Sequence, residues 1–530
     1  MAKISELIVQ TILDKENLLI RRLFRVQYRR GIISYYTKIH RKPRLTSKNL
    51  QGSSRRLKAV GFRLLQLEGF IFMNICDLRA TELAQLIKEK KLSPVEVTKA
   101  YLERIDKLNS KVNAFITLDA EGALEQARRA EKEEAVGPLH GVPVAIKDLS
   151  YTKGMRTTCG SLTLKDNVPD FDSISVTRIR QAGAVILGKT NTPEFGYKGI
   201  TNNRVFGPTL NPWNLERHAG GSSGGSASAV AANLVPIAEG TDGAGSIRIP
   251  ASFCGVVGFK PSFAMVPRYP IPDLYYTLSH TGPIARHVDE AALLFEVLAG
   301  ASSHDNLSMS PYNWHKSALD KLHIAYSPNL NYAPVEDEVA KIVSQAAQKF
   351  TELGYTLSEE NPPIEEDPEP LELNIWNTVY ASRYAPLSEE TKALLTPEMV
   401  DIIEEGMKLP AYMYSKDSIK RTKLYYTMDK LFERYDLMIT PTMPVEAFDS
   451  KLERPESING RKISTLFGWT PFTYPFNLTG QPAITVPAGL SSDGMPIGLQ
   501  IVGPRGSDRF VLEVAKRFEE LAPFPELKFS

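Results

Sequence analysis

The chain has 530 residues, which is too long for one small hydrophobic core and indicates either one large domain with insertions or two to three domains. Its composition, 42% hydrophobic and 23% charged with a formal net charge of +2, is typical of a soluble globular protein, and no apolar run approaches the ~20 residues that a membrane helix needs. Three cysteines and eight scattered histidines, with no pair at metal-ligand spacing, exclude a disulfide framework, argue against a zinc site and favour a reducing, cytoplasmic compartment.

Residues 1–72 form a basic head. They hold 16 of the 63 Lys and Arg residues but only 4 of the 61 Asp and Glu residues, so the rest of the chain is acidic on balance and has no electrostatic reason to bind nucleic acid. The composition of the head fits a transit peptide, and also a nucleic-acid or membrane-surface tail. We favour a third interpretation, that the head is disordered or no part of the native protein. Met73 opens an ordinary globular sequence, and the codons of Glu68 and Gly69 can spell a ribosome-binding stretch at a suitable distance from it.

The sequence after the head predicts alternating helices and strands. Ser93-Pro94-Val95-Glu96 is a capping box with proline at the first helical position, and apolar residues follow at helical spacing. Helical periodicity also predicts helices over 336–353 and 510–521. Short apolar runs predict six buried strands, at 142–148, 184–189, 322–327, 436–440, 483–487 and 497–503. Buried strands that alternate with helices indicate an α/β fold, a single large domain whose β-sheet is sandwiched between layers of α-helices.

The stretch from His218 to Gly255 is rich in small residues but carries an apolar run that a flexible linker would lack. A tight turn such as Gly243-Ala244-Gly245-Ser246 lets backbone N–H groups converge on one point, as an oxyanion hole for acyl transfer requires. Ser246, at the end of this turn, is therefore a candidate nucleophile. The second glycine-rich run, Gly220 to Gly225, permits unusual backbone angles and the close approach of another segment.

A nucleophilic serine needs a base. The sequence lacks the Gly-x-Ser-x-Gly elbow of α/β-hydrolases, and neither His218 nor His140 has an evident acid to orient it. The other candidate is Lys147, at the end of the predicted strand 142–148. Burial can lower a lysine pKa from ~10.4 to ~7–8, which would let Lys147 act as a base at neutral pH.

Taken together, these segments resemble the amidase signature family. The stretch from Gly220 to Pro250, which ends in Ser-Ile-Arg-Ile-Pro, is similar to the family's signature. "HGVPVAIKD" resembles its lysine motif, and "PFNLTGQPAITVPAG" and "GMPIGLQIVGP" resemble its C-terminal elements. The similarity covers Met73 to the end of the chain, so the resemblance implies an amidase domain over 73–530 with a mixed sheet, which hydrolyses a small-molecule amide without a cofactor or metal.

The resemblance also implies a Ser–Ser–Lys triad. Ser246 matches the nucleophile that forms the acyl-enzyme, Lys147 matches the base, and Ser222 matches the bridging serine, which the family holds after a cis peptide bond. Ser223 is adjacent, so it stays as the alternative to Ser222. This chain has Gly-Ala-Gly-Ser where many members have Thr-Gly-Gly-Ser, but backbone donors do not depend on that change. The implied oxyanion donors are the N–H groups of Gly243, Ala244, Gly245 and Ser246.

Residues around the triad have plainer interpretations. We expect Asp242 and Arg248 to hold the loop through an ion pair or backbone hydrogen bonds, and Cys254 to be a buried small hydrophobe. We expect the pocket to be built by loops at about 267–280 and 362–426. Four aromatic residues near these loops are each expected in core or rim packing, namely Tyr275, Tyr276, Trp376 and Trp469.

Three functions remain open from the sequence. The first is a stand-alone amide hydrolase. The second is the A subunit of a tRNA-dependent amidotransferase, which shares the fold and triad but has glutamine where this chain has Ile249. The third is a binding module that has lost activity, against which the intact Lys147, Ser222 and Ser246 argue. A homodimer is left open as the assembly.

Overall fold

The computed structural model describes residues 74–310 and 319–530. The expectations for residues 1–72 therefore lie outside the described residues. In the described part, eleven strands form one sheet in the order β1-β3-β2-β6-β8-β7-β14-β15-β11-β9-β10, and two small two-stranded sheets pair β12 with β13 and β4 with β5.

The strands are β1 (Phe115–Leu118), β2 (Pro143–Lys147), β3 (Val185–Thr190), β4 (Leu210–Asn211), β5 (Asn214–His218), β6 (Ile237–Asp242), β7 (Val257–Lys260), β8 (His280–Ala285), β9 (His323–Tyr326), β10 (Thr356–Glu359), β11 (Leu437–Pro441), β12 (Ser457–Ile458), β13 (Arg461–Lys462), β14 (Ala483–Leu490) and β15 (Pro496–Val502). The α-helices are α3 (Ala80–Lys88), α4 (Pro94–Val112), α5 (Ala120–Lys132), α6 (Ile174–Gln181), α7 (Gly224–Ala231), α8 (Arg248–Cys254), α9 (Val288–Leu298), α10 (Asp337–Gln348), α11 (Glu369–Tyr384), α12 (Glu389–Lys392), α13 (Pro397–Lys408), α14 (Ala411–Phe432), α15 (Pro475–Thr479) and α16 (Asp508–Leu521). The short 3₁₀ helices are η2 (Ile75–Asp77), η3 (Leu162–Leu164), η4 (Glu194–Gly196) and η5 (Lys349–Leu353).

The sheet is mixed. β2 pairs in parallel with β3 on one side and with β6 on the other, whereas β8, β7, β14, β15 and β11 follow one another in antiparallel pairs. The six strands expected from apolar runs are all present, as β2, β3, β9, β11, β14 and β15. The sequence-based expectation of a single large α/β domain with a mixed sheet is confirmed.

The helix starts follow local sequence. Ser93 Oγ accepts the backbone N–H groups of Val95 and Glu96, and the Glu96 carboxylate accepts the Ser93 N–H, so the capping box begins α4 as expected. The helix expected over 336–353 is α10 continued by the 3₁₀ turn η5, and the C-terminal one is α16.

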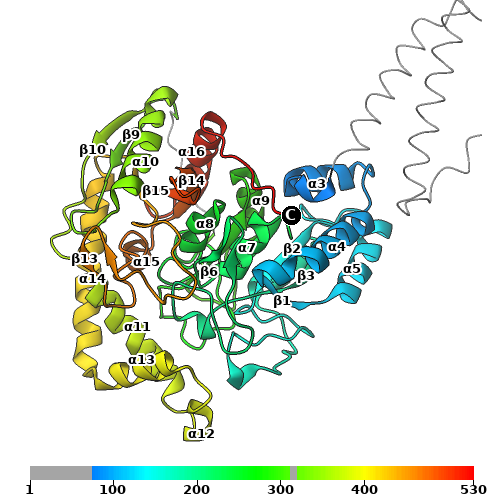
Figure 1. Cartoon of the computed structure of the whole chain (residues 1–530), viewed down its shortest axis with the longest axis horizontal. Helices are drawn as coiled ribbons and strands as arrows, with labels where there is room; N and C mark the ends of the chain where they lie inside the picture. The colour runs from blue at the N-terminus through cyan, green and yellow to red at the C-terminus, as the bar shows by residue number, and fades with distance from the viewer. Residues whose placement is uncertain (1–73, 311–318) are drawn as a thin grey trace, which may run out of the picture. The chain divides into compact units, whose positions relative to one another are not determined.

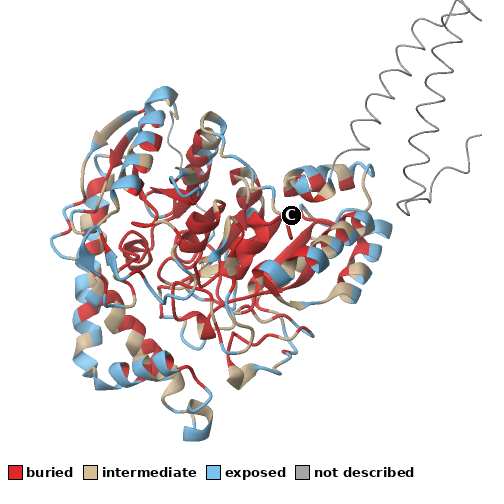
Figure 2. Ribbon diagram, in the orientation of Figure 1, coloured by how far each residue is buried: buried red, intermediate tan, exposed pale blue. Residues whose placement is uncertain are grey.

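Helices cover both faces of the sheet (Figure 1). α4, α7 and α8 pack on one face, and α9, α10 and α16 pack on the other. The central strands of the sheet are buried, as the red ribbon of Figure 2 shows, whereas the edge strands β1 and β10 are largely half-buried or exposed. A second apolar cluster gathers around α11, α13 and α14, beside the end of the sheet where the candidate site lies.

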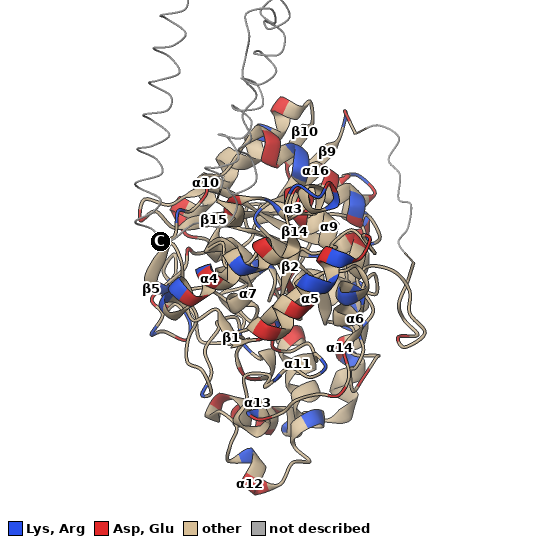
Figure 3. Cartoon of the chain, turned by 90° about the vertical axis from the view of Figure 1, so that its right-hand side faces the viewer, with Lys and Arg blue, Asp and Glu red and all other residues tan. Residues whose placement is uncertain are grey.

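The outer helices carry mixed charge. Basic and acidic residues alternate along α4 and α5 (Figure 3). Within the described ranges, none of the helices combines the length and apolar character that crossing a membrane would require.

Candidate active site

The three residues of the expected triad lie at the ends of three different elements. Lys147 is the last residue of β2, Ser222 lies just before α7, and Ser246 lies in the turn between β6 and α8. The peptide bond between Gly221 and Ser222 is cis, as the resemblance implied. The parallel pairing of β2 and β6 sets these ends side by side.

The amine of Lys147 lies within a cluster of hydroxyl groups. Its Nζ is 2.7 Å from Ser222 Oγ, 2.8 Å from Ser223 Oγ and 2.8 Å from Thr241 Oγ1. Ser223 Oγ also donates to the Thr241 carbonyl at 3.1 Å, whereas Ser222 lines the pocket together with Ser246. Geometry therefore favours Ser222 over Ser223 as the link between amine and pocket.

Lys147 is a buried residue with a perturbed pKa. Its side chain is fully buried, and burial lowers its pKa to about 7, against the opposing effects of Glu239 and Asp242. Lys147 is not a surface residue paired with the adjacent Asp148, because Asp148 is also fully buried and accepts the Thr158 hydroxyl at 2.6 Å. An amine of this kind is neutral in a substantial fraction near pH 7 and has a lone pair that can take a proton.

An ion pair holds the nucleophile turn. Arg248 Nε lies 3.0 Å from Asp242 Oδ2, and both side chains are fully buried. Burial alone would raise the pKa of the Asp242 carboxyl, but the Arg248 guanidinium more than offsets this and holds that pKa well below its usual range. The same carboxylate accepts the N–H groups of Gly245 at 2.7 Å and Ile247 at 3.1 Å. The expectation that Asp242 and Arg248 hold the loop is confirmed.

The turn leaves backbone donors for a substrate. The Gly245 N–H, expected among the oxyanion donors, is engaged by Asp242. Among the hydrogen bonds of the described residues, none uses the N–H groups of Gly243, Ala244 or Ser246. Gly245 has φ of +125°, and a Cβ on it would lie 2.4 Å from Thr473 Oγ1, so only glycine fits this position.

Ser222 and Ser246 line a cavity of about 880 Å³. Residues 267–273 supply much of its wall, as expected. The second expected region, 362–426, also contributes, but through the helix α11 and not through a loop as the sequence suggested. Tyr276 and Trp376, which the sequence placed in core or rim packing, line the cavity. Trp469 is buried in a separate apolar cluster, and Tyr275 is 70% exposed. The aromatic side chains of the wall are Tyr151, Phe195, Tyr269, Tyr276, Trp376, Tyr380 and Tyr384.

The two histidines near the motifs in sequence are engaged elsewhere. His218 Nε2 lies 2.6 Å from the Leu452 carbonyl, and His140 Nε2 lies 2.9 Å from the Ala130 carbonyl. Neither lines the cavity at the serines. The described residues hold no group of three or more His, Cys, Asp or Glu side chains arranged for a metal ion.

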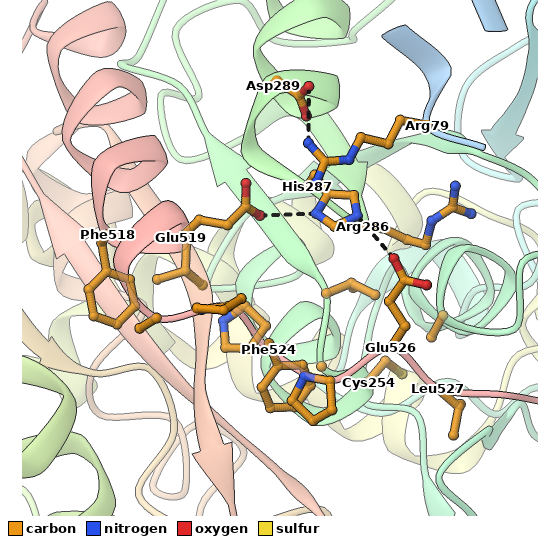
Figure 4. A pocket seen from close by; sticks show the side chains of 18 of the residues that line it. Arg79, Cys254, Arg286, His287, Asp289, Phe518, Glu519, Phe524, Glu526 and Leu527 are labelled. Atoms are coloured by element: carbon orange, nitrogen blue, oxygen red, sulfur yellow. Dashed lines mark ion pairs between the residues drawn. The ribbon is translucent and has the colours of Figure 1, made fainter. Parts of the chain in front are cut away.

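A second cavity, of about 220 Å³, lies beside the C-terminal segment (Figure 4). His287 lies between two carboxylates there, 3.4 Å from Glu519 Oε1 and 3.6 Å from Glu526 Oε1. Cys254 lines this cavity and is fully buried, as expected. None of the triad residues reaches it, so we assign it no part in the chemistry.

Sequence reasoning missed two residues of the site and offered Ser223 only as an alternative. The missed residues, Thr241 and Glu239, both lie on β6 beside Lys147. The sequence did carry one indication of them. Glu239 and Thr241 are two positions apart just before the nucleophile turn, which puts both side chains on one face of a strand. Their proximity to Lys147 depends on the pairing of β2 with β6, which local sequence does not reveal.

Comparisons with known proteins agree with this geometry. The family model described as Amidase matches residues 96–512. An acylamidase of Rhodococcus erythropolis is 38% identical over 466 residues, covering 86% of this chain and 98% of the relative. The A subunit of a glutamyl-tRNA(Gln) amidotransferase from Moorella thermoacetica is 37% identical over 494 residues, covering 86% and 99%. The crystal structure of a bacterial aryl acylamidase of the amidase signature enzymes matches with a TM-score of 0.79 at 32% identity, covering 84% of this chain and 96% of that one.

Proposed function

Because the chain belongs to the amidase signature family, whose members hydrolyse amides, we propose that it is a free-standing amidase acting through a Ser246 acyl-enzyme. The observation that carries the proposal is the 2.7 Å contact between the buried Lys147 amine and Ser222 Oγ, at the edge of the cavity that Ser246 also lines. In this arrangement we assign Lys147 as the base, Ser222 as the proton relay and Ser246 as the nucleophile.

In the proposed reaction Ser246 Oγ attacks the amide carbonyl carbon. The Ser246 proton passes to Ser222 Oγ as Ser222 gives its own proton to neutral Lys147. The N–H groups of Gly243, Ala244 and Ser246 stabilise the negative charge on the carbonyl oxygen. The C–N bond then breaks, and the proton returns along the same path to the leaving nitrogen.

The second half of the reaction repeats these steps with water. Water attacks the Ser246 ester as Lys147 accepts one of its protons through Ser222. The ester C–O bond then breaks, and the proton returns from Lys147 through Ser222 to the Ser246 oxygen, which releases the carboxylic acid and restores Ser246 and neutral Lys147. This chemistry uses side chains and backbone groups of the chain alone, and we propose that it needs no cofactor.

The cavity favours a hydrolase of bulky amides over one component of an amidotransferase. Its volume of about 880 Å³, with seven aromatic side chains in the wall, suits an aryl or large apolar amide better than glutamine. Ile249, where the resemblance implied glutamine for the amidotransferase, is 2% exposed and packs in an apolar cluster. The alternative keeps support from relatives of similar identity that are named as the A subunit of such an amidotransferase.

A substrate comparison tests the proposal. The purified chain is labelled with a fluorophosphonate, and the labelled peptide is identified. Initial rates are then compared for acetanilides and for glutamine, with no partner protein present. Labelling at Ser246 with faster turnover of the anilides supports the proposal. Turnover of glutamine alone would favour the amidotransferase component, and no labelling with no turnover would favour the inactive binding module.

The three cysteines support a cytoplasmic location. Cys76, Cys159 and Cys254 are free and buried, as suits a reducing compartment.

A further inference from the structure

Glu239 is a fully buried carboxylate in β6, the strand beside β2. Glutamate is rarely fully buried without a charged partner. In the described chain its oxygens accept hydrogen bonds from three uncharged groups. These are the backbone N–H of Lys147 at 3.1 Å, the hydroxyl of Ser150 at 2.6 Å and the hydroxyl of Ser175 at 3.4 Å. The carboxylate thus holds both the proposed base and the loop that follows it.

The bond to Lys147 continues the sheet where its backbone pairing stops. The ladder between β2 and β6 ends at Ala145 and Ala238, and two residues later a side-chain oxygen accepts the Lys147 N–H. Thr241, two residues after Glu239 and so on the same side of β6, bonds the Lys147 amine at 2.8 Å. One face of one strand therefore fixes Lys147 at both its backbone and its amine.

The other carboxylates near Lys147 have their own partners. Asp242 is paired with Arg248 at 3.0 Å. Asp148 accepts the hydroxyl of Thr158 at 2.6 Å and its N–H at 3.0 Å. Of these acids, Glu239 and then Asp242 oppose the lowering of the Lys147 pKa by burial, and among the ion pairs of the described residues Asp242 has one and Glu239 has none.

One further cation faces this cluster. Lys189, on β3, donates to Thr152 Oγ1 at 2.9 Å and to the Ser150 carbonyl. Ser150 in turn donates its hydroxyl to Glu239. Ser150 therefore links Lys189 to Glu239. Burial raises the pKa of the Glu239 carboxyl, and the hydrogen bond from Ser150, the charge of Lys189 and the Lys147 N–H each act against this shift and favour the carboxylate.

We propose that Glu239 is a positioning residue for the reaction. It holds the Lys147 backbone so that the amine reaches Ser222, and its negative charge stabilises the ammonium that forms when Lys147 takes the proton. Glu239 does not line the cavity, so it acts through Lys147 and touches no substrate. The inference rests on the proposed role of Lys147 as the base.

Glu239→Gln tests the proposal, because it keeps the shape of the side chain and removes the charge. We expect kcat to fall about 10-fold or more with KM nearly unchanged, since a misplaced catalytic group costs rate rather than substrate binding. Loss of the negative charge disfavours the ammonium form of Lys147, so the acid limb of kcat/KM should move to lower pH. Glu290→Gln is the matched control: Glu290 is also fully buried and accepts a backbone N–H, that of Ala80 at 2.6 Å, away from the site. It should keep the parent kcat and pH profile.

The outcomes separate this inference from the proposed function. Parent kcat and pH profile in Glu239→Gln overturn the inference, and so does a lower kcat with an unmoved acid limb, which would leave a structural role alone. Full activity in Lys147→Ala, measured alongside, would instead overturn the proposed function. If Glu239→Gln does not fold, Glu239→Asp is measured instead, because it keeps the charge and shortens the side chain. A lower kcat with the parent acid limb supports the inference, and a parent kcat overturns it.

Discussion

At the scale of single residues, the proposed triad consists of one buried amine, that of Lys147, and two hydroxyls, those of Ser222 and Ser246. Lys147 and Ser246 could be proposed from the residues themselves, because the lysine after an apolar strand and the small-residue turn each have a chemical reason, whereas Ser222 was anticipated only by the resemblance to the family. Thr241 and Glu239 could not, because their roles depend on which strand lies beside β2. Their spacing of two residues places both side chains on one face of a strand, but the local sequence does not show that Lys147 lies beside that face.

Ser246→Ala should abolish turnover and leave the fold intact. The variant removes the attacking oxygen, and loss of a triad member lowers kcat by a factor on the order of 10⁴ or more. Ser246 lies in a turn held by Asp242 and Arg248, so the thermal midpoint should stay close to that of the parent. Ser252→Ala, at a buried serine within α8, is the control and should keep both activity and fluorophosphonate labelling. Persistent labelling of Ser246→Ala would show that another residue is the nucleophile.

The pH profile should report Lys147. Its pKa is lowered to about 7 by burial, and only the neutral amine can accept a proton. Activity is therefore lost as pH falls through this pKa and is full above it, so kcat/KM should rise through one ionisation near pH 7 and level off on the alkaline side. The measurement is kcat/KM from about pH 5 to about pH 10 with a neutral amide.

Variants identify the group behind that ionisation. Lys147→Ala should be inactive across the pH range, and Lys147→Arg should not restore activity, because a guanidinium stays charged. His218→Ala and His140→Ala should keep the parent profile, since both histidines bond to backbone carbonyls away from the cavity. Loss of the neutral ionisation in a histidine variant, together with an active Lys147→Ala, would contradict the Ser–Ser–Lys assignment.

At the scale of elements, local sequence predicted the strands that are continuous apolar runs and missed the others. β6 reads "IAEGTD" and β8 reads "HTGPIA", so both contain residues that rarely form strands. They are strands because neighbours on each side supply backbone partners, as β2 and β8 do for β6. The missed element β6 is also the one that holds Lys147, through Glu239 and Thr241. These two polar residues occupy strand positions where apolar residues would have made the strand easier to predict.

The helix α11 should set the preference for large substrates. Trp376, on this helix, is 4% exposed and its ring would lie 2.9 Å from a Cβ placed on Gly243, so it forms the wall directly beside the nucleophile turn. Trp376→Leu should raise KM for an acetanilide about 10-fold, which corresponds to ~1.4 kcal/mol of lost binding. Acetamide, which is too small to reach the wall, should be affected less. Steady-state kinetics on the two amides measure the difference.

Trp469→Leu is the matched control for this prediction. Trp469 is as deeply buried, at 2% exposed, but it packs against Phe253 and Phe448 away from the cavity. Its loss should lower the free energy of unfolding by ~3 kcal/mol and leave KM for the anilide unchanged in the folded fraction. An unchanged KM in Trp376→Leu would mean that the anilide binds elsewhere in the cavity.

At the scale of the whole molecule, the order of the strands could not be predicted from the sequence. β7 pairs with β14, which follows it by more than two hundred residues, as in the pair of Lys260 and Ala483. Such pairings give no periodic signal, and only the resemblance to a known family anticipated the mixed sheet. The cavity could not be predicted for the same reason. Its wall combines segments that are far apart in sequence, namely the turn at Ser246, residues 267–273 and the helix α11.

A shortened protein tests whether residues 1–72 belong to the working enzyme. The site, the sheet and the matched family region all lie after Met73, so a version that begins at Met73 should keep the kcat/KM and the thermal midpoint of the full chain. One that begins at Pro94 should not, because it loses α3 and the Ser93 cap of α4. The buried Leu83 leaves the core with α3, and Glu290 loses the Ala80 N–H that it accepts at 2.6 Å. Calorimetry and steady-state kinetics on the three proteins compare these losses. A large fall in stability or activity in the version from Met73 would show that the basic head takes part in the fold, and N-terminal sequencing of the native protein would then find a start near Met1.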